Sequence, residues 1–190
     1  MKKINKCRNC KNKKLENLFS LGFLSFTGKF SKKKTNIPKD EIKLVKCKKC
    51  NLVQLSKNFN PNYLYGKDYG YRSGINKTMT EHLTSISKKM SKLTNLKKND
   101  QVLDIASNDA TLLNSYKKKN IIKVGVDPIL KKFIKFYKNI DFKIPSLFSK
   151  EIIFKNKIYK KFKIITACAV FYDMQDPNKF LKEISHLIDP

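Results

Sequence analysis

The sequence predicts an α/β fold in two parts, a small cysteine-stapled module followed by a domain with a parallel sheet. Two observations predict it. Two CxxC pairs lie within the first 50 residues, and strand patterns alternate with helical patterns from about residue 100 onward. Apolar residues make up 41% of the 190-residue chain, which is enough for a packed core and excludes a wholly disordered protein.

The first part contains four cysteines in two pairs, Cys7 with Cys10 and Cys47 with Cys50. In a reducing cytosol such pairs favour four thiolate ligands of one Zn²⁺ over disulfides. Because four protein ligands close a tetrahedral shell, we expect the zinc to be structural. Two redox-active pairs are the alternative, but neither pair follows a strand in a thioredoxin-like βαβ pattern.

The segments around these cysteines predict a small module over residues 1–75. Residues 15–30 are apolar with two glycines, a polar run follows, and residues 41–47 show a short strand pattern. Residues 51–78 are rich in Asn, Gly and Tyr without a helical period, which is typical of a connecting segment. A module this small buries little core, so metal binding is expected to supply part of its folding free energy.

The second part, residues 76–190, begins with one amphipathic helix over about residues 76–96. Its apolar residues recur at spacings of three and four, and we expect all of them in the core: Met79, Leu83, Ile86, Met90 and Leu93. Strands are then predicted at 101–106, 121–126, 142–144 and 162–170, and helices at 110–119, 127–138 and 177–187. This order implies βαβ units and a Rossmann-like domain.

A nucleotide-type site is predicted where the first two strands of this domain end. Asp104 closes the first strand and precedes a turn of small residues whose N–H groups can approach a ligand. Asp127 ends the second strand, where a carboxylate can accept both hydroxyls of a ribose; capping the next helix before Pro128 is the alternative. Because no GxGxxG motif is present, a ligand with a ribose but no pyrophosphate fits better than NAD or FAD.

The charge balance bears on whether the chain binds nucleic acid. The chain has 42 Lys and Arg against 15 Asp and Glu, a formal charge of +27, yet only Arg8 and Arg72 are arginines. A nucleic-acid reader is expected to use arginine for bidentate contacts, so the lysines favour a solvated surface. A nucleic-acid-binding zinc ribbon remains the alternative, and it predicts binding that falls steeply with salt.

The location follows from what the sequence lacks. No apolar run approaches the roughly 18 residues of a membrane span. The basic N-terminus is not followed by the apolar stretch of a secretory signal peptide. We therefore expect a cytoplasmic protein.

Several motifs occur together in the order of one known family: CRNC, CKKCNLVQL, LYGKDYGYRSGINKTMTEHL, VLDIASNDATLL, VGVDP and ITACAVFYDMQDPNKFLKEI. In these segments the chain resembles the S-adenosylmethionine (SAM)-dependent sugar C-methyltransferases. Members of that family join a zinc-binding domain to a class I methyltransferase domain and a further C-terminal domain. The resemblance implies methyl transfer to a carbon of a nucleotide-linked deoxysugar, for surface-glycan or secondary-metabolite synthesis.

The resemblance also implies roles for individual residues. The methionine end of SAM would be lined by Asp104, Ser107, Asn108 and Asp109. Asp127 would hold the ribose, and Ala167 and Cys168 would lie along the cofactor, although Cys168 also fits a small core residue. The tyrosine-rich motif near the reacting sugar corresponds to Tyr69, Tyr71 and Ser73.

Two positions depart from the family pattern. Ala110 stands where the family has glycine, and because alanine favours helices we expect a mild effect. Asp173 stands where the family has a histidine implicated as base; a carboxylate can serve if burial raises its pKa, and a loop role is the alternative. Of the two histidines, His186 is expected on the surface. His82 lies within the family's motif on the long helix; a position on the helix surface is expected, and a position facing the cleft is the alternative.

The family continues beyond the last residues of this chain with a glycine turn and a fifth strand. The resemblance therefore implies a truncated chain whose strand at 162–170 has an open edge. Self-association through this edge and an inactive fragment are expected. A non-catalytic remnant that binds zinc and a cofactor is the third interpretation.

Overall fold

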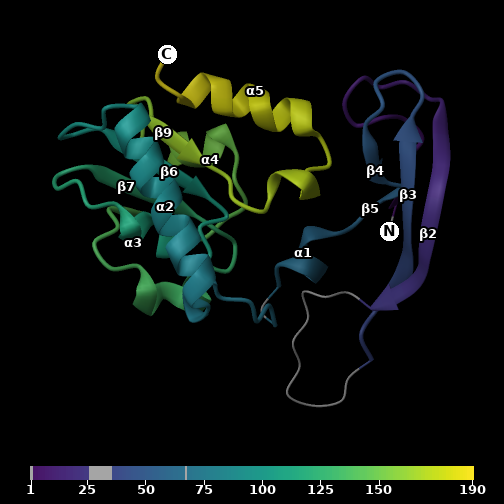
Figure 1. Cartoon of the computed structure of the whole chain (residues 1–190), viewed down its shortest axis with the longest axis horizontal. Helices are drawn as coiled ribbons and strands as arrows, with labels where there is room; N and C mark the ends of the chain where they lie inside the picture. The colour runs from purple at the N-terminus through teal and green to yellow at the C-terminus, as the bar shows by residue number, and fades with distance from the viewer. Residues whose placement is uncertain (1, 26–35, 67) are drawn as a thin grey trace. The chain divides into compact units, whose positions relative to one another are not determined.

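The computed structural model describes residues 2–25, 36–66 and 68–190 (Figure 1). The chain forms two compact units. The first comprises residues 1–71 with 175–178, and the second residues 72–174 with 179–190. Among the described residues, no helix has the length and apolar character that crossing a membrane requires.

The first unit is built on two small antiparallel sheets. Strands β2 (Leu15–Ser25), β3 (Lys39–Cys47) and β4 (Val53–Leu55) form the larger sheet in the order β2-β3-β4, and β1 (Lys2–Lys3) pairs with β5 (Lys57–Asn58). A short helix, α1 (Pro61–Leu64), follows. The predicted strand at 41–47 lies within β3, whereas β2 was not predicted because irregular register breaks its alternation between Asn17 and Phe23. Cys47 is the last residue of β3, whereas Cys7, Cys10 and Cys50 lie in turns and loops outside the strands.

The second unit contains the predicted parallel sheet. Its strands are β6 (Gln101–Ile105), β7 (Ile122–Val126), β8 (Phe142–Ile144) and β9 (Ile164–Thr166), in the order β8-β7-β6-β9. All pairs are parallel, and Asp104 stands opposite Gly125 on one side and Thr166 on the other. The Rossmann-like core is thus confirmed. β9 is shorter than the predicted strand because the chain turns after Thr166.

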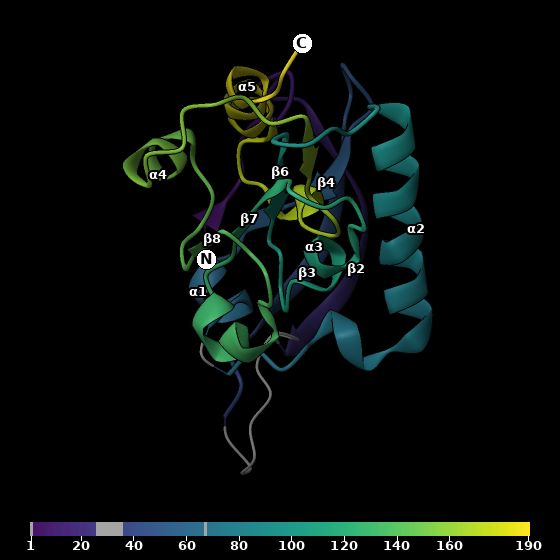
Figure 2. The same ribbon diagram turned by 90° about the vertical axis from the view of Figure 1, so that its left-hand side faces the viewer.

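Helices cover both faces of the parallel sheet (Figure 2). On one side lie α2 (Lys77–Leu93) and α3 (Thr111–Ser115), and on the other α4 (Lys150–Lys155) and α5 (Pro177–Leu187). The main core lies under α4 and α5, where buried side chains of β6 and β7 pack with those helices: Leu103, Ile105, Val124, Val126, Ile153, Phe180 and Leu187. Alternation along the strands therefore directs Asp104 and Gly125 to the opposite face.

The predicted helix at 76–96 is confirmed as α2, which begins at a cap where Asn76 Oδ1 accepts a hydrogen bond from Met79 N at 3.1 Å. Its buried face differs from the prediction. Leu93 is 69% exposed, and Ser87 is buried instead. The Ser87 hydroxyl donates a hydrogen bond to Thr84 O at 2.9 Å and accepts one from Ser115 Oγ at 2.7 Å. A polar contact therefore joins α2 to α3.

Three further elements correct the sequence-based predictions. The helix predicted at 110–119 stops at Ser115, because Tyr116 is extended. The helix predicted at 127–138 is a 3₁₀ segment, η2 (Leu130–Phe136), whose apolar residues fit either period. α4 was not predicted; its six residues are too few to show a clear helical period. The short 3₁₀ turns η1 (Ser73–Ile75) and η3 (Phe171–Asp173) complete the element order.

The outer edge of β9 carries one unexpected pairing. Phe162, just before β9, forms a parallel bridge with Ile188: Phe162 N donates to Leu187 O at 2.8 Å, and Asp189 N donates to Phe162 O at 2.9 Å. Lys163 N donates to Gln101 O at 2.8 Å, on the side of β6. The sequence predicted an open edge, and at Phe162 this prediction is wrong because the residues after α5 cover it. By alternation, Ile164 and Thr166 direct their backbone groups to the same outer side.

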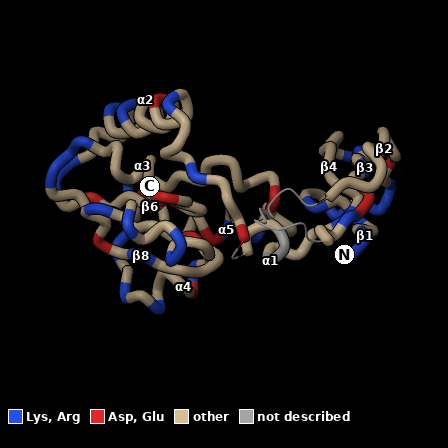
Figure 3. The backbone as a smooth tube through the Cα atoms, turned by 90° about the horizontal axis from the view of Figure 1, so that it is seen from below, with Lys and Arg blue, Asp and Glu red and all other residues tan. Residues whose placement is uncertain are grey.

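Lysine and arginine positions occur along both units and on most elements rather than on one segment (Figure 3). This distribution fits the solvated lysine surface expected from the composition.

Candidate cofactor site and metal centre

The carboxyl end of β6 is the point at which the strand order reverses, because β7 and β9 pair with its two sides. In open α/β sheets this position forms the crevice that binds ligands. The residues predicted to bind the cofactor all lie at this end of the sheet: Asp104 in β6, Ser107, Asn108 and Asp109 in the loop after β6, Asp127 after β7, and Ala167 and Cys168 after β9.

The loop after β6 has the backbone of a glycine-rich turn although it contains no glycine. Three alternate residues lie in the left-handed region: Ala106 (φ 59°), Asn108 (φ 51°) and Ala110 (φ 61°). An alanine there costs about 1–2 kcal/mol. The expectation of a mild, helix-favouring effect at Ala110 is wrong, because Ala110 precedes α3 in a left-handed conformation. The sequence signal for this turn, which was missed, is a small residue or asparagine at every second position after Asp104.

Asp127 holds this loop from the neighbouring strand. Its Oδ2 accepts a hydrogen bond from Asn108 N at 2.8 Å, and its Oδ1 accepts one from Ile129 N at 2.8 Å. Only 4% of Asp127 is exposed, and this burial raises the pKa of its carboxyl group while the two N–H donors lower it. The capping role considered as an alternative is thus present, yet about two of the four lone-pair sites of the carboxylate remain for a ligand.

Asp104 is buried beneath the loop and contacts β9. Thr166 Oγ1 donates to Asp104 Oδ1 at 2.6 Å. Burial raises the pKa of Asp104 to about 7; the bond from Thr166 opposes this shift and the charge of Asp127 adds to it. Near neutral pH the carboxyl group can therefore act as donor or acceptor. Thr166 was not singled out from the sequence.

A buried tyrosine fixes Ser107. Tyr137 Oη donates to Asn108 O at 2.9 Å, so in the 2.8 Å contact between the two hydroxyls Ser107 Oγ is the donor to Tyr137 Oη. The ring lies directly against β7: a Cβ at Gly125 would lie 2.9 Å from Tyr137 Cε1 and 3.0 Å from Ser107 Oγ. The glycine in β7 thus makes room for a tyrosine that sequence reasoning missed.

A second segment is held against the loop by Asp109 and Asn108. Asp109 Oδ2 accepts from Gly74 N at 2.9 Å and from Arg72 Nη1 at 3.1 Å, and Asn108 Oδ1 accepts from Ser73 N at 2.9 Å. A Cβ at Gly74 would lie 2.7 Å from Asp109 Oδ2, so only glycine permits this approach. We call these contacts the 72–74 clasp. They give Asp109 and Asn108 a structural role that the sequence did not indicate, and Arg72 was missed.

Both predicted residues after β9 are half-buried. Burial raises the pKa of the Cys168 thiol to about 11, and the charge of Asp104 adds to this effect. The thiol therefore stays protonated at neutral pH and is not a nucleophile. The cofactor contacts of Ala167 and Cys168 stay predictions.

The three residues predicted to act on the substrate lie on two segments. Asp173 ends η3 and donates its N–H to Val170 O at 3.0 Å. Tyr69 and Tyr71 belong to the first unit, where the Tyr69 ring lies 5.6 Å from that of Tyr65. Their catalytic roles stay predictions. His82 and His186 are exposed, as expected.

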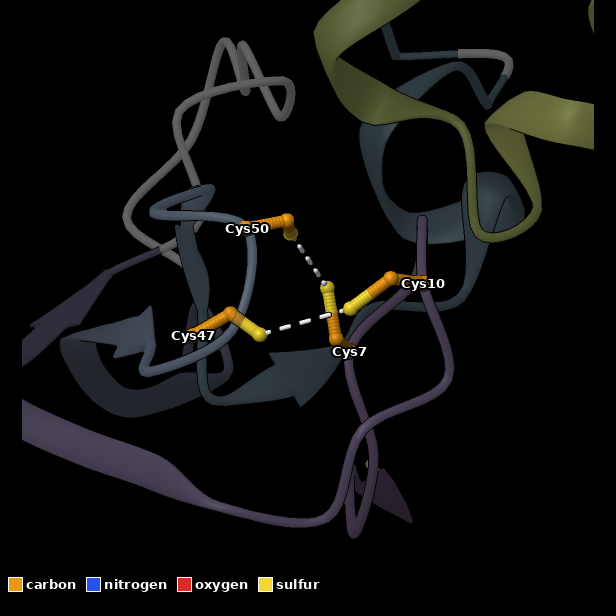
Figure 4. A group of neighbouring side chains, drawn as sticks. All are labelled: Cys7, Cys10, Cys47 and Cys50. Atoms are coloured by element: carbon orange, nitrogen blue, oxygen red, sulfur yellow. Dashed lines mark hydrogen bonds between the residues drawn. The ribbon is translucent and has the colours of Figure 1, made fainter.

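The four cysteines of the first unit converge on one point (Figure 4). Cys7 Sγ lies 3.6 Å from Cys50 Sγ, Cys10 Sγ lies 3.5 Å from Cys47 Sγ, and all four sulfurs lie within 4.8 Å of one another. A Zn–S distance of about 2.3 Å in a tetrahedron separates the sulfurs by about 3.8 Å. The thiols thus fit one Zn²⁺ with little movement. The closest pairs join different CxxC motifs, which favours a shared metal over two redox pairs.

Backbone and side-chain N–H groups surround these sulfurs. Lys49 N lies 3.4 Å and Asn12 Nδ2 3.8 Å from Cys47 Sγ. The backbone N–H of Cys50 is the largest cause that lowers the pKa of Cys47 to about 6. For Cys7, burial raises the pKa, but backbone N–H groups and the Gln54 side chain outweigh it, so the pKa is lowered. Such groups favour the thiolate forms of Cys7 and Cys47 that zinc requires. For Cys10, the backbone N–H of Asn12 lowers the pKa, but burial and the neighbouring thiols outweigh it and raise the pKa to about 11.

Comparison with known proteins supports this centre. Residues 7–65 match the family model Methyltransf_13, described as "Putative zinc binding domain". The first unit is a zinc-binding module. The matched segment is less than half of the chain.

Curated proteins and solved structures give two further comparisons. No match was found among curated proteins. Among solved structures, the chain is similar to the crystal structure of the plantazolicin methyltransferase BamL in complex with a triazolic desmethylPZN analog and SAH. The identity is 21% and the TM-score 0.48, over 60% of this chain and 44% of that one. The chain thus spans less than half the length of that structure.

Proposed function

We propose that this chain is a SAM-dependent methyltransferase module with a structural zinc, and that its substrate is a carbon of a nucleotide-linked deoxysugar. The observation that carries the proposal is the loop after β6. Its left-handed residues at 106, 108 and 110 lie at the strand-order reversal, between two buried carboxyl groups. Strained backbone of this kind persists at ligand sites, where close approach of the main chain is needed.

The residues at the carboxyl ends of β6, β7 and β9 fit a nucleoside with a charged amino-acid end. Asp127 keeps lone pairs for ribose hydroxyls after accepting from Asn108 and Ile129. Asp104 and the clasped loop border the place of the amino-acid end, and a short polar side chain, Thr166, sets the orientation of Asp104. When bound, SAM would supply an electrophilic methyl group on a sulfonium.

The substrate step would use residues of two segments. Asp173 is the candidate base that takes a proton from the ring carbon beside a keto group. Tyr69 and Tyr71 would donate hydrogen bonds to the developing enolate oxygen and orient the sugar. The 72–74 clasp, which follows these tyrosines directly in the sequence, joins the loop after β6 through Asp109 and Asn108.

Binding of S-adenosylhomocysteine to the zinc-loaded chain tests the cofactor part of the proposal. Isothermal titration should give saturable 1:1 binding, and Asp127→Ala should weaken it by about 10-fold to 100-fold, because charged hydrogen bonds contribute about 1.5–3 kcal/mol each. His186→Gln, at an exposed position, is the matched control. The absence of binding by the wild-type chain would overturn the proposal.

The substrate part needs a separate assay. Keto-deoxysugar nucleotides are incubated with SAM carrying a ¹³C-methyl group, and NMR of the product identifies the methylated atom. Label on a ring carbon is expected. Label on oxygen or nitrogen, or on acceptors other than the sugar alone, would agree with a methyltransferase activity but would refute the proposed C-methylation of a sugar. Asp173→Asn should then abolish transfer while leaving cofactor binding unchanged.

A further inference from the structure

A buried amide beside the zinc centre lacks a partner for its donor group. Gln54 lies in the middle of β4, opposite Val45 of β3, and only 7% of it is exposed. Within the described part of the chain, its Nε2 is buried and forms no hydrogen bond. An unsatisfied buried donor costs about 1–3 kcal/mol, so a partner in the metal-loaded protein is expected.

The other end of this amide is held by Arg8, the residue that follows Cys7. Arg8 N donates to Gln54 Oε1 at 3.0 Å, and Arg8 Nη1 lies 3.5 Å from the same oxygen. Both contacts come from donors, so they identify the oxygen of the amide and direct its NH₂ group away from Arg8 N.

The guanidinium of Arg8 is itself anchored on the strands. Nη1 donates to Leu55 O at 2.9 Å, and Nη2 donates to Lys57 O at 3.0 Å and to Asn58 Oδ1 at 2.8 Å. A planar fork with several donors can reach these acceptors together, whereas a lysine ammonium cannot. Arg8 therefore ties the first CxxC turn to β4 and β5 and fixes the position of Gln54.

Cys7 precedes Arg8 directly in the chain and is fully buried. The Gln54 side chain is among the groups that lower the pKa of the Cys7 thiol. On the other knuckle, Cys47 has the N–H donors of Lys49 and Asn12 close to its sulfur. Four thiolates around one Zn²⁺ carry a net charge of about −2, which N–H donors to sulfur stabilise.

We propose that Gln54 is a positioning residue of the zinc centre: with zinc bound, its Nε2–H donates a hydrogen bond to the Cys7 thiolate, while Arg8 holds its Oε1. Groups of this kind behind a metal ligand typically change metal affinity by about 10-fold to 100-fold. Arg8 and Gln54 thus act as one unit that delivers a single N–H to the sulfur. This inference is independent of the proposed methyl transfer.

Zinc competition with a chromogenic chelator tests the proposal on the full chain. Gln54→Met keeps the size of the side chain but removes the donor, and it should weaken zinc binding by about tenfold or more. Gln175→Met is the matched control, because Gln175 is exposed and donates to Phe59 O at 3.2 Å. Arg8→Lys should weaken binding similarly, and the double variant should lose little more than either single one, since both changes remove the same contact.

The Co²⁺-loaded protein separates a hydrogen bond from mere packing. Loss of an N–H donor to a thiolate raises the energy of the sulfur lone pair, so the sulfur-to-cobalt charge-transfer band of Gln54→Met should move to longer wavelength. Gln175→Met should leave the band in place. Weaker metal binding with an unshifted band would show that Gln54 acts by packing alone and would overturn the proposal, as would unchanged affinity in Gln54→Met.

Discussion

The guanidinium Nη1 of Arg72 lies 3.1 Å from Oδ2 of Asp109, a carboxylate whose side chain is only 1% exposed. The same guanidinium lies over the ring of Phe136, 4.1 Å from its centroid. One arginine therefore joins three segments: the end of the connecting region, the loop after β6, and η2. This clasp holds the loop after β6 through Asp109 and Asn108.

Removing this arginine should destabilise the second unit. Arg72→Met leaves the buried Asp109 carboxylate without its cation, and the free energy of unfolding should fall by about 2–3 kcal/mol. Urea denaturation of the zinc-loaded protein measures it. Lys77→Met is the control: the Lys77–Glu81 pair is 89% and 66% exposed, so its loss should cost under about 1 kcal/mol. Equal effects of the two substitutions would contradict a structural role for the clasp.

The left-handed alanines allow a test in which the sign of the change is diagnostic. Ala106→Gly relieves about 1–2 kcal/mol of backbone strain. It also raises the conformational entropy of the unfolded chain, which costs about 0.5–1 kcal/mol of stability. The free energy of unfolding should therefore rise by about 0.5–1 kcal/mol. Ala167, which is also half-buried and has a negative φ, is the control. Ala167→Gly should lower the stability by about 0.5–1 kcal/mol. Chemical denaturation of both variants should give opposite signs; the same sign in both would remove the strain argument.

Asp104 predicts a pH dependence of stability. Its folded-state pKa, raised by burial to about 7, lies above the unfolded value, so the folded protein binds more protons between these two values. The contribution of this group to stability therefore falls as the pH rises from about 4 to about 7 and is level above that. Asp104→Asn, which cannot ionise, should gain stability relative to the wild type over this range. Denaturation curves from pH 5 to 8 measure the difference; a constant difference would show that Asp104 titrates normally.

Metal analysis should give one zinc per chain, because four thiols converge on one tetrahedral site. Cys47→Ser should lose the metal and the fold of the first unit, and chelation of the wild type should do the same, since metal binding supplies folding free energy. Cys168→Ser should keep a full equivalent of zinc. Zinc retained by Cys47→Ser would exclude the proposed ligand set.

Local patterns allowed much of the second unit to be predicted. The buried strands β6 and β7 and the helices α2 and α5 have clear apolar periods, and parallel order follows from their alternation. The four zinc ligands follow from CxxC spacing alone. The loop conformation could not be predicted in the same way, because alanine rarely adopts a left-handed backbone and the surrounding fold imposes it at 106 and 110.

The clasp lay beyond sequence reasoning for a different reason. Arg72 and Asp109 are 37 residues apart, and neither belongs to a periodic pattern. A contact of this range depends on where two loops meet, which no local propensity encodes. The same holds for Gln54, whose importance depends on a pairing with Arg8 across 46 residues.

The bridge at Phe162 bears on the order in which the sheet is completed during synthesis. The strands β6, β7 and β8 can pair as soon as they emerge from the ribosome, since their partners lie nearby in the chain. Phe162 N donates to Leu187 O and Phe162 O accepts from Asp189 N, so the segment just before β9 stays uncovered on that side until α5 and the residues after it have been made. During that interval a chaperone or a second nascent chain has its best access to this strand.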